Sequence, residues 1–369
     1  MEKKEIYALY LPQYHEIPEN NEWWGKGYTE WNAVKSAKSY FKGHVQPKIP
    51  LDNRYYDLSD ESGKTLVWQA NLAKMYGIDG FAIYHYWFKD GKKLLEKPME
   101  ILLSHPDINI NYFICWANEP WKRTWYQNNG KQVLMPQEYG TSVEWKNHYD
   151  YLRQFFLDKR YKKINNKPIV AIYNTRAIEK LQQMKTVWNE MAIADGFNGI
   201  YLLGAKTMYE QEIRKNIVDG EYLFEPAYSL KYQYSFFQKG KRLVNKIISY
   251  YASKLFHKTM IRDRENMKDL YKSIKIPTKY ASKDIYYGIC PSWDNTPRKQ
   301  LGGCIFMNSS PKLFCEKLKQ ILKSKVGGNL VIINAWNEWG EGAYLEPDEH
   351  NNVAYLEAVK KAVDDDVLE

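Results

Sequence analysis

The sequence lacks any long apolar run, which bears on where the protein resides. A membrane-spanning helix needs about 18 or more consecutive apolar residues, and no such run occurs among the 369 residues. The first stretch, MEKKEIYALYLPQYH, contains an apolar segment that is too short for a signal peptide. The chain as given is therefore expected to be cytoplasmic.

Cysteine is also scarce, and its spacing offers no zinc site. The four cysteines are Cys115, Cys290, Cys304 and Cys315, and none belongs to a C-x-x-C arrangement. Cys115 and Cys290 lie in strand-like runs, where a reduced and buried thiol is the usual state. We expect neither a metal ion nor a cofactor.

A phosphate-binding pattern is missing as well. No Gly-rich loop follows the first strand-like run, and Rossmann-type nucleotide-binding sheets depend on such a loop. A conventional sugar-nucleotide transferase would therefore lack its usual parts. No recognised nucleic-acid motif is present either, so we expect no nucleic-acid partner.

The sequence instead alternates strand-like and helix-like segments. Short apolar, β-branched or aromatic runs lie at residues 6–11, 80–86, 111–116, 168–173, 199–204, 222–226, 285–290 and 330–336. Amphipathic segments separate them, and residues 62–77, for example, place Leu66, Ala70 and Ala73 on one helical face. Eight such units predict an α/β fold, a (β/α)8 TIM barrel that uses residues 1–369 as one domain. A doubly wound open sheet is the alternative.

In a parallel barrel the active site lies at the C-terminal ends of the strands. Carboxylates, aromatic rings and amides follow seven of the eight strand-like runs, which is the expected lining of a sugar cleft. The aromatic content of 15% is compatible with carbohydrate binding, although aromatic faces stack on sugars, bases and methyl-rich ligands alike. The candidate substrate-binding residues are Tyr10, His85, Tyr86, Trp87, Trp116, Asn118, Glu119, Tyr173, Glu225, Trp293, Asp294, Arg298, Trp336 and Asn337.

The stretch NAWNEWGEGAYLEPD at residues 334–348 holds the two strongest catalytic candidates. Glu338 and Glu341 stand three apart directly after the last strand-like run. A core segment would not carry two unpaired carboxylates, because burying a charge without a partner is costly. Two carboxylates on a barrel rim can act as a glycosidase pair, one as acid and one as nucleophile or base. The residues alone also allow Glu119 or Glu225 as the second partner.

One segment, an insertion at about residues 229–283, interrupts the regular alternation of strand-like and helix-like segments. Residues 231–283 hold 14 Lys and Arg against three Asp and Glu, a net charge of +11, whereas the whole chain carries +9. The insertion is expected to be helical, with an apolar stripe formed by Val244, Ile247, Ile248 and Tyr251. Either this stripe packs on the barrel, or the segment binds anionic lipid or a phosphate-bearing substrate at the inner membrane face.

Several motifs resemble known families of carbohydrate-active enzymes. The stretch NEWGEG…EP at residues 337–347 resembles the N-E-W-x-E-G signature of glycoside hydrolase family 99, the endo-α-mannosidases. Other motifs resemble the bacterial WbsX-type glycosyltransferases of surface-polysaccharide clusters, which share the family 99 barrel. These motifs are LPQYHEIPENNEWWGKGYTEW at 11–31, GHVQPKIP at 43–50, GIDGFAIYHYWF at 77–88, CWANEPW at 115–121 and PSWDNTPR at 291–298.

The resemblance implies a mechanism that retains the anomeric configuration through a 1,2-anhydro sugar. By this resemblance Glu338 would take a proton from the sugar 2-hydroxyl, and Glu341 would act first as acid and then as base for water. Where the endomannosidases carry histidine between the two glutamates, this chain has Gly340. The resemblance also implies substrate contacts for Glu119, Tyr173 and Arg298 and an orienting role for Asn337.

Three functions are compatible with the sequence. The first is a retaining glycosidase or transglycosidase acting on an α-linked glycan, with mannose as a candidate sugar, in a bacterial surface polysaccharide or its lipid-linked precursor. The second is a WbsX-type glycosyltransferase of O-antigen or capsule biosynthesis, which the expected cytoplasmic location favours. The third is a non-catalytic carbohydrate-binding barrel. The two candidate catalytic glutamates favour an enzyme.

Overall fold

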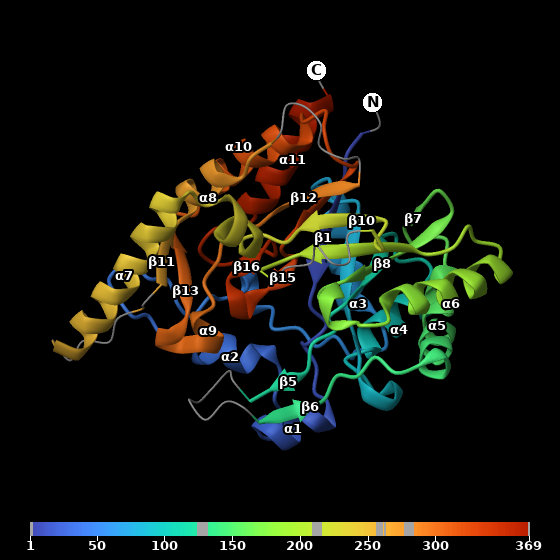
Figure 1. Ribbon diagram of the computed structural model, residues 1–369. Helices are drawn as coiled ribbons and strands as arrows, with labels where there is room; N and C mark the ends of the chain where they lie inside the picture. The colour runs from blue at the N-terminus through green and yellow to red at the C-terminus, as the bar shows by residue number, and fades with distance from the viewer. Residues whose placement is uncertain are drawn as a thin grey trace.

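Eight parallel strands close into a barrel at the centre of the molecule (Figure 1). A computed structural model describes residues 3–123, 132–208, 216–255, 261, 263–276 and 284–367, without the side chains of residues 252–255 and 367. The barrel strands are β1 (Glu5–Tyr10), β2 (Gly80–Trp87), β4 (Asn111–Trp116), β8 (Lys167–Ile172), β9 (Tyr201–Lys206), β10 (Gly220–Leu223), β12 (Ile285–Ile289) and β14 (Leu330–Ile333). Strand β1 pairs with both β2 and β14, which closes the sheet. The predicted (β/α)8 barrel is confirmed, with small differences at strand ends.

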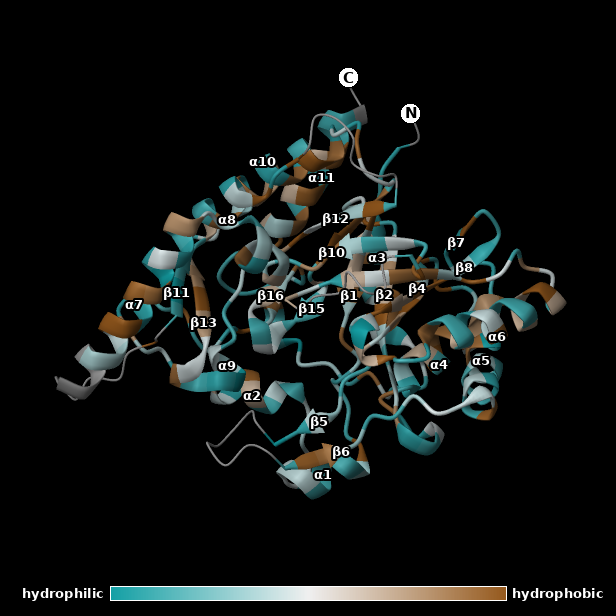
Figure 2. Ribbon diagram, in the orientation of Figure 1, coloured by the Kyte–Doolittle hydropathy of each residue, from teal (hydrophilic) through white to brown (hydrophobic). Residues whose placement is uncertain are grey.

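Helices surround the barrel and bury their apolar faces against it. They are α3 (Lys64–Met75), α4 (Lys97–Ser104), α5 (Ser142–Phe156), α6 (Leu181–Ala194), α8 (Met267–Ser273), α10 (Pro311–Leu322) and α11 (Ala354–Val367). The predicted helical face of α3 is confirmed, because Leu66, Ala70 and Ala73 are all buried. Figure 2 shows the result, with apolar colouring in the barrel strands and mixed colouring on the helices.

Short elements gather around the C-terminal ends of the barrel strands, some of them at the bottom of Figure 1 and others in its middle or at its left. They include α1 (Pro18–Trp24), α2 (Glu30–Ser36), α9 (Thr296–Lys299) and three two-stranded pairings. The short strands are β5 (Trp121–Lys122) with β6 (Val133–Met135), β15 (Asn337–Glu338) with β16 (Ala343–Tyr344), and β11 (Asp263–Asn266) with β13 (Cys304–Met307). Two more, β3 (Lys93–Leu94) and β7 (Lys163–Ile164), pair with β2 and β8. The rim is thus built from segments that are distant in sequence.

The basic insertion forms a long helix, α7 (Phe236–Leu255), that projects from the left side of the barrel in Figure 1. Its cations hold it in place, because Arg242 lies 2.5 Å from Asp263 and 3.2 Å from Glu265 of β11. Lys246, one turn further on, lies 2.8 Å from Asp263. The remaining residues of the segment at 256–260 and 277–283 lie outside the described residues.

The apolar stripe of α7 faces outward. Val244, Ile247, Ile248 and Tyr251 are between 47% and 60% exposed. The alternative in which this stripe packs on the barrel is therefore wrong, because Arg242 and Lys246 occupy the face that meets β11. No helix within the described ranges is long and apolar enough to cross a membrane.

Gly288 sits where two barrel strands approach closely, and this contact can be tested. A Cβ at this position would overlap the backbone carbonyl of Leu223 in the neighbouring strand β10. We expect Gly288→Ala to lower the free energy of unfolding by about 2 kcal/mol or more, because overpacked interiors must shift. Urea unfolding measures the change. Gly302→Ala, at an exposed glycine where an added Cβ would meet no other atom, should change stability little, and an equal loss in both variants would contradict the argument.

Candidate active site

Arg298 lies at the centre of three glutamates on the rim. Its Nε donates to Glu30 at 2.6 Å, its Nη2 donates to Glu338 at 2.8 Å, and its Nη1 lies 3.0 Å from Glu341. These four residues are called the Arg298 cluster below. The two predicted catalytic glutamates and the predicted arginine therefore meet in one place, together with Glu30, which sequence reasoning missed.

Separate rim segments carry the Arg298 cluster and are bonded to one another. Glu30 begins α2, and Arg298 lies in α9 after β12. The other two glutamates follow β14, in β15 and in the 3-10 turn after it. The backbone N–H of Asp294 donates to the carbonyl of Glu341 at 2.7 Å, which ties the loop after β12 to the loop after β14. The four charged groups are thus held before any substrate arrives.

The cluster is enclosed on most sides. The Glu30 side chain is fully buried, that of Glu338 is 7% exposed, and that of Glu341 is 22% exposed. Three ionised carboxylates around one guanidinium would leave two uncompensated charges, which is costly in an enclosed site. Burial, opposed by Arg298 and reinforced by the neighbouring carboxylates, raises the pKa of Glu338 to about 8. Burial also raises the pKa of Glu30, so the cluster keeps at least one proton at neutral pH.

The buried carboxylate of Glu346 explains why tryptophans occur next to the two catalytic candidates. A buried indole N–H needs an acceptor, and the Glu346 carboxylate supplies it to both Trp336 and Trp339, at 2.9 and 2.7 Å. The same carboxylate accepts from Tyr56 at 2.9 Å and from Gln69 at 2.7 Å. Burial raises the pKa of Glu346 to about 7 against the effect of these donors. Trp336 and Trp339 therefore fix the buried side of the loop through their hydrogen bonds to Glu346.

Gly340 leaves the space that Glu30 and Arg298 occupy. A Cβ at residue 340 would overlap the carboxylate of Glu30 and lie 2.7 Å from Nε of Arg298. The backbone between the two catalytic candidates therefore touches the Glu30–Arg298 ion pair directly. A side chain at position 340 and the Glu30 carboxylate in its observed place therefore exclude one another.

Tyrosines line the barrel interior next to the cluster. Burial raises the pKa of both Tyr84 and Tyr86, and the nearby charge of Glu338 raises it further. Tyr173, which is half-buried, lies near Tyr84 and packs edge-on against Phe224 at 5.3 Å between ring centres. Tyr86 and Tyr173 were predicted site residues. Tyr84 was missed, although its alternation with Tyr86 along β2 places both on the inner face.

The family of the chain follows from a match along nearly its whole length. The profile of the family Glycosyltransferase WbsX matches residues 6–359. The chain belongs to the WbsX glycosyltransferase family. The resemblance drawn from the motifs is therefore confirmed.

Two related proteins match this chain along nearly its whole length. Protein WxcX from two strains of Xanthomonas campestris pathovar campestris is 32% and 31% identical to this chain over 363 residues, which is 97% of the chain. The chain spans about half the length of these relatives, 49%.

Solved structures share the fold at low sequence identity. A family 99 endo-α-mannosidase from Bacteroides thetaiotaomicron, in complex with bis-tris-propane, has a TM-score of 0.59 and 12% identity, with 99% of this chain and 97% of that chain covered. A glycoside hydrolase-like protein has a TM-score of 0.57 and 15% identity, with 98% and 94% covered. At such identities the likeness shows the fold alone.

Three residues predicted to line the sugar cleft lie instead on the outer face of this WbsX-family barrel. His85 Nε2 lies 2.9 Å from His148 of α5, and Trp87 stacks on the same histidine at 4.4 Å between ring centres. Trp116 meets His148 edge-on at 4.7 Å. Side chains alternate between the two faces of a strand, so the neighbours of the inward-facing tyrosines point outward to α5.

Three further predicted residues are enclosed and hydrogen-bonded within the protein. Tyr10 donates to Gln69 at 2.7 Å, and Trp336 donates to Glu346. Asn337 accepts from the N–H of Leu11 at 2.7 Å and donates to its carbonyl at 3.0 Å. All three side chains are almost completely buried. They support the loop that carries the glutamates, and the structure places none of them in the cleft.

Asn118, Glu119 and Glu225 form other parts of the rim. Asn118 is buried and bonds to the backbone of Asn174 at 2.8 Å in both directions, which joins the loops after β4 and β8. Glu119 is half-buried and accepts from the Asn174 side chain at 3.1 Å. Glu225 is buried and accepts from the Ser229 hydroxyl at 2.6 Å, and burial raises its pKa to about 7. None of the three is bonded to the Arg298 cluster within the described residues.

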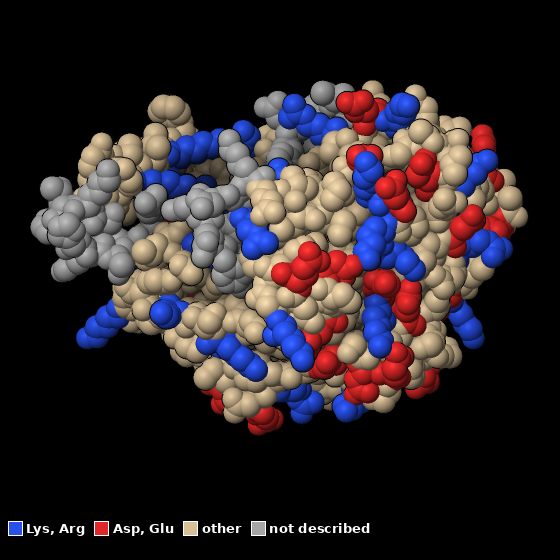
Figure 3. Space-filling model, turned by 90° about the horizontal axis from the view of Figure 1, so that it is seen from below, with Lys and Arg blue, Asp and Glu red and all other residues tan. Residues whose placement is uncertain are grey.

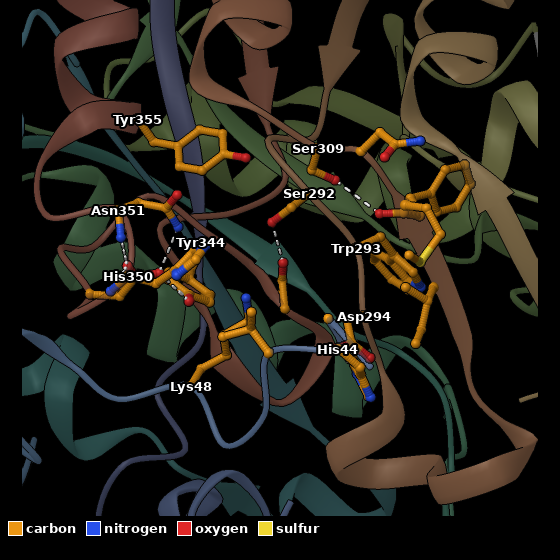
Figure 4. Close-up of a pocket in the computed structure, with 18 of the residues that line it drawn as sticks. His44, Lys48, Ser292, Trp293, Asp294, Ser309, Tyr344, His350, Asn351 and Tyr355 are labelled. Carbon is orange, nitrogen blue, oxygen red and sulfur yellow. Dashed lines mark hydrogen bonds and ion pairs between the residues drawn. The ribbon is translucent and has the colours of Figure 1, made fainter. Parts of the chain in front are cut away.

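Trp293 and Asp294 line a separate pocket beside the cluster (Figure 4). Asp294 is buried and lies 2.8 Å from His44 and 2.7 Å from the Gln46 amide. Although burial opposes it, hydrogen bonds from His44 and Thr296 hold the pKa of Asp294 below its ordinary value. No group of three or more His, Cys, Asp or Glu residues is arranged to hold a metal ion in the part of the chain that the structure describes.

The raised pKa of Glu338 makes stability depend on pH in a definite direction. Its folded-state pKa of about 8 exceeds its ordinary value of 4.5, so between these pH values the unfolded chain releases a proton that the folded chain keeps. This carboxyl therefore contributes stability at low pH that is lost as pH rises through about 8. We expect the melting temperature of Glu338→Gln to fall less between pH 5 and pH 8 than that of the wild type, by several degrees.

Thermal unfolding at the two pH values measures this difference. Glu190→Gln, at an exposed glutamate of α6, is the matched control and should behave as the wild type does. Identical pH dependence in Glu338→Gln and the wild type would show that Glu338 is ionised in the folded protein.

Proposed function

We propose that the Arg298 cluster is the active site of an enzyme that breaks or transfers an α-linked glycosidic bond through a 1,2-anhydro sugar, with retention of configuration. The observation that carries the proposal is that Glu338 and Glu341 contact one guanidinium, Nη2 at 2.8 Å and Nη1 at 3.0 Å. Membership of the WbsX family and the barrel shared with family 99 support it.

The different exposure of the two carboxylates suits different roles. Glu341 is the more exposed and can meet a leaving oxygen and then an incoming hydroxyl. Glu338 is enclosed and suits a base that acts on the sugar's own 2-hydroxyl. Arg298 stabilises Glu338 in its ionised form, which the base must adopt when substrate is bound.

The proton balance of the cluster fits two steps. When substrate binds, the proton that the free cluster keeps moves from Glu338 to Glu341. In the first step Glu338 takes the proton of the 2-hydroxyl while that oxygen bonds to the anomeric carbon, and the bond from this carbon to the leaving oxygen breaks as Glu341 gives that oxygen its proton. In the second step the attacking hydroxyl oxygen bonds to the anomeric carbon as Glu341 takes its proton, and the bond from that carbon to the 2-oxygen breaks as Glu338 returns its proton to the 2-oxygen. The cluster begins and ends each cycle with the same single proton on this pair.

The attacking hydroxyl decides between two versions of the function. Water gives hydrolysis, whereas a hydroxyl of a second glycan gives transfer. Family membership favours transfer, and we propose a bacterial surface polysaccharide or its lipid-linked precursor as the substrate.

Substitution of either glutamate tests the assignment. Glu338→Gln and Glu341→Gln should each lower activity by at least ~10²-fold, because a positioned acid or base usually contributes that much. The assay uses free and lipid-linked α-manno-oligosaccharides and follows products by NMR, which also reports the anomeric configuration. Glu22→Gln, at an exposed rim glutamate of α1, is the control. Near-wild-type turnover in either catalytic variant, or inversion of configuration, would refute the assigned roles.

We also propose that α7 holds the protein against an anionic membrane. The helix has five Lys and Arg and no acidic residue. Its outward stripe continues to Phe236 and Phe237, which are 93% and 80% exposed. Figure 3 looks at the rim and shows mainly Lys and Arg on the left side, where α7 lies, and most of the acidic residues on the right. A basic helix with an apolar face is the pattern that binds anionic lipid surfaces.

Vesicle binding tests this second proposal. Each Lys near an anionic surface contributes about 1 kcal/mol, so the double variant Lys239→Gln with Lys241→Gln should bind phosphatidylserine-containing vesicles about tenfold less tightly or worse. Binding of the wild type should fall steeply at high salt. The control is Lys159→Gln with Lys180→Gln, two exposed lysines outside α7. Equal and negligible sedimentation of wild type and variant with these vesicles would refute membrane binding.

A further inference from the structure

A second pocket adjoins the Arg298 cluster, and the proposed mechanism leaves it unused. Its cavity measures about 170 Å³, below the roughly 300–1,000 Å³ of pockets for drug-sized ligands, so its size suits a single sugar unit. Three parts of the chain line it, and these are residues 41–48, residues 292–294 with 305–309, and residues 342–355. Figure 4 shows the side chains converging from these loops on one space.

The pocket shares a wall with the catalytic loop. Gly342 lines it and directly follows Glu341 in the chain. Asp294 also lines it, and its backbone N–H holds the carbonyl of Glu341 at 2.7 Å. A molecule in this pocket therefore lies next to the loop that presents the acid/base residue.

Both carboxylates of the pocket are already saturated by internal donors. Asp348 accepts from the Tyr344 hydroxyl at 2.6 Å, the His350 N–H at 2.9 Å, the Asn351 amide at 3.0 Å and the Asn351 N–H. The partners of Asp294 are His44 at 2.8 Å, Gln46 at 2.7 Å, and the Thr296 hydroxyl and N–H at 2.7 and 3.1 Å. Neither carboxylate has a free lone pair with which to attract a cation or a sugar hydroxyl.

The one lysine that lines the pocket, by contrast, has no ion-pair partner among the described residues. Lys48 is half-buried, lines the cavity and makes no ion pair there. In Figure 4 its side chain rises from the lower loop toward the middle of the pocket. A second cation, Arg264, lies outside the lining and stacks over the lining residue Phe41 at 4.0 Å. The lysine of the lining is therefore available to a negatively charged ligand, whereas the two carboxylates are not.

Aromatic faces complete the lining. Trp293 is half-buried and borders the side of the pocket opposite Tyr344 and Tyr355 (Figure 4). Flat aromatic faces pack against the apolar faces of pyranose rings, whereas a small inorganic anion gains nothing from them. The combination of an unpaired lysine, fully hydrogen-bonded carboxylates and aromatic walls is complementary to a ring that carries a negative group.

We propose that this pocket binds one acidic sugar, a pyranose carrying a carboxylate or a phosphate. As a subsite of the polysaccharide it rests on the proposed function of the neighbouring cluster, but binding itself does not require catalysis. An acidic unit held here would place the adjoining glycosidic bond at the Glu341 loop, so the pocket would select acidic polysaccharides.

Calorimetric titration of the full chain tests the proposal with four probes: glucuronic acid, glucose 6-phosphate, glucose and inorganic phosphate. The two acidic sugars separate a carboxylate from a phosphate as the charged group. We expect at least one of them to bind about tenfold or more tightly than glucose, because a charge-assisted hydrogen bond contributes about that factor. Lys48→Met should lose this preference, and Lys42→Met, an exposed lysine of the same loop outside the pocket, should keep it.

Trp293→Leu separates a sugar site from an anion site. It should weaken the acidic sugar and leave inorganic phosphate unchanged. The proposal fails if neither acidic sugar binds, if glucose binds as tightly, if Lys48→Met binds as the wild type does, or if Trp293→Leu has no effect. Glu341→Gln should bind the acidic sugar normally while losing activity. Retained activity in that variant would refute the proposed function alone and leave the pocket result in place.

Discussion

The charge balance around Arg298 constrains the rest of the rim. One guanidinium faces three carboxylates, two of them enclosed, and such an excess of negative charge is tolerated only if a proton stays in the cluster. Every loop that supplies a member must hold its position closely, because a displaced carboxylate would leave either itself or the arginine unpaired. The bonds from Asn337 to the Leu11 backbone and from Asp294 to the Glu341 carbonyl meet this requirement.

The same constraint explains a motif that mixes bulky aromatics with charges. The tryptophans on either side of Glu338 both donate to Glu346, so the loop has a polar anchor on its buried side. The catalytic candidates project from the opposite side. A loop that must hold two carboxylates at one arginine gains rigidity from hydrogen bonds that never touch the substrate.

Periodicity was sufficient to predict the barrel, because each strand and its following helix show their burial in the local sequence. It was also sufficient to bring Glu338, Glu341 and Arg298 to one rim. It did not resolve which face of a strand end each residue occupies, and His85, Trp87 and Trp116 were misplaced for that reason. Glu30 was missed because it begins a short helix far along the chain from the last strands, and only the folded chain shows that it meets an arginine 268 positions away. The outward orientation of the apolar stripe on α7 depends likewise on ion pairs to β11, and the hydrophobic periodicity of the helix does not predict these pairs.

The contact between Gly340 and the Glu30–Arg298 pair has a consequence for divergence within the wider fold. A side chain at position 340 and a carboxylate at position 30 compete for one volume, so the two positions cannot drift independently. A substitution that adds a side chain at position 340 therefore requires the loss or displacement of Glu30. Related sequences should therefore rarely combine a side chain at the position of Gly340 with a glutamate at the position of Glu30.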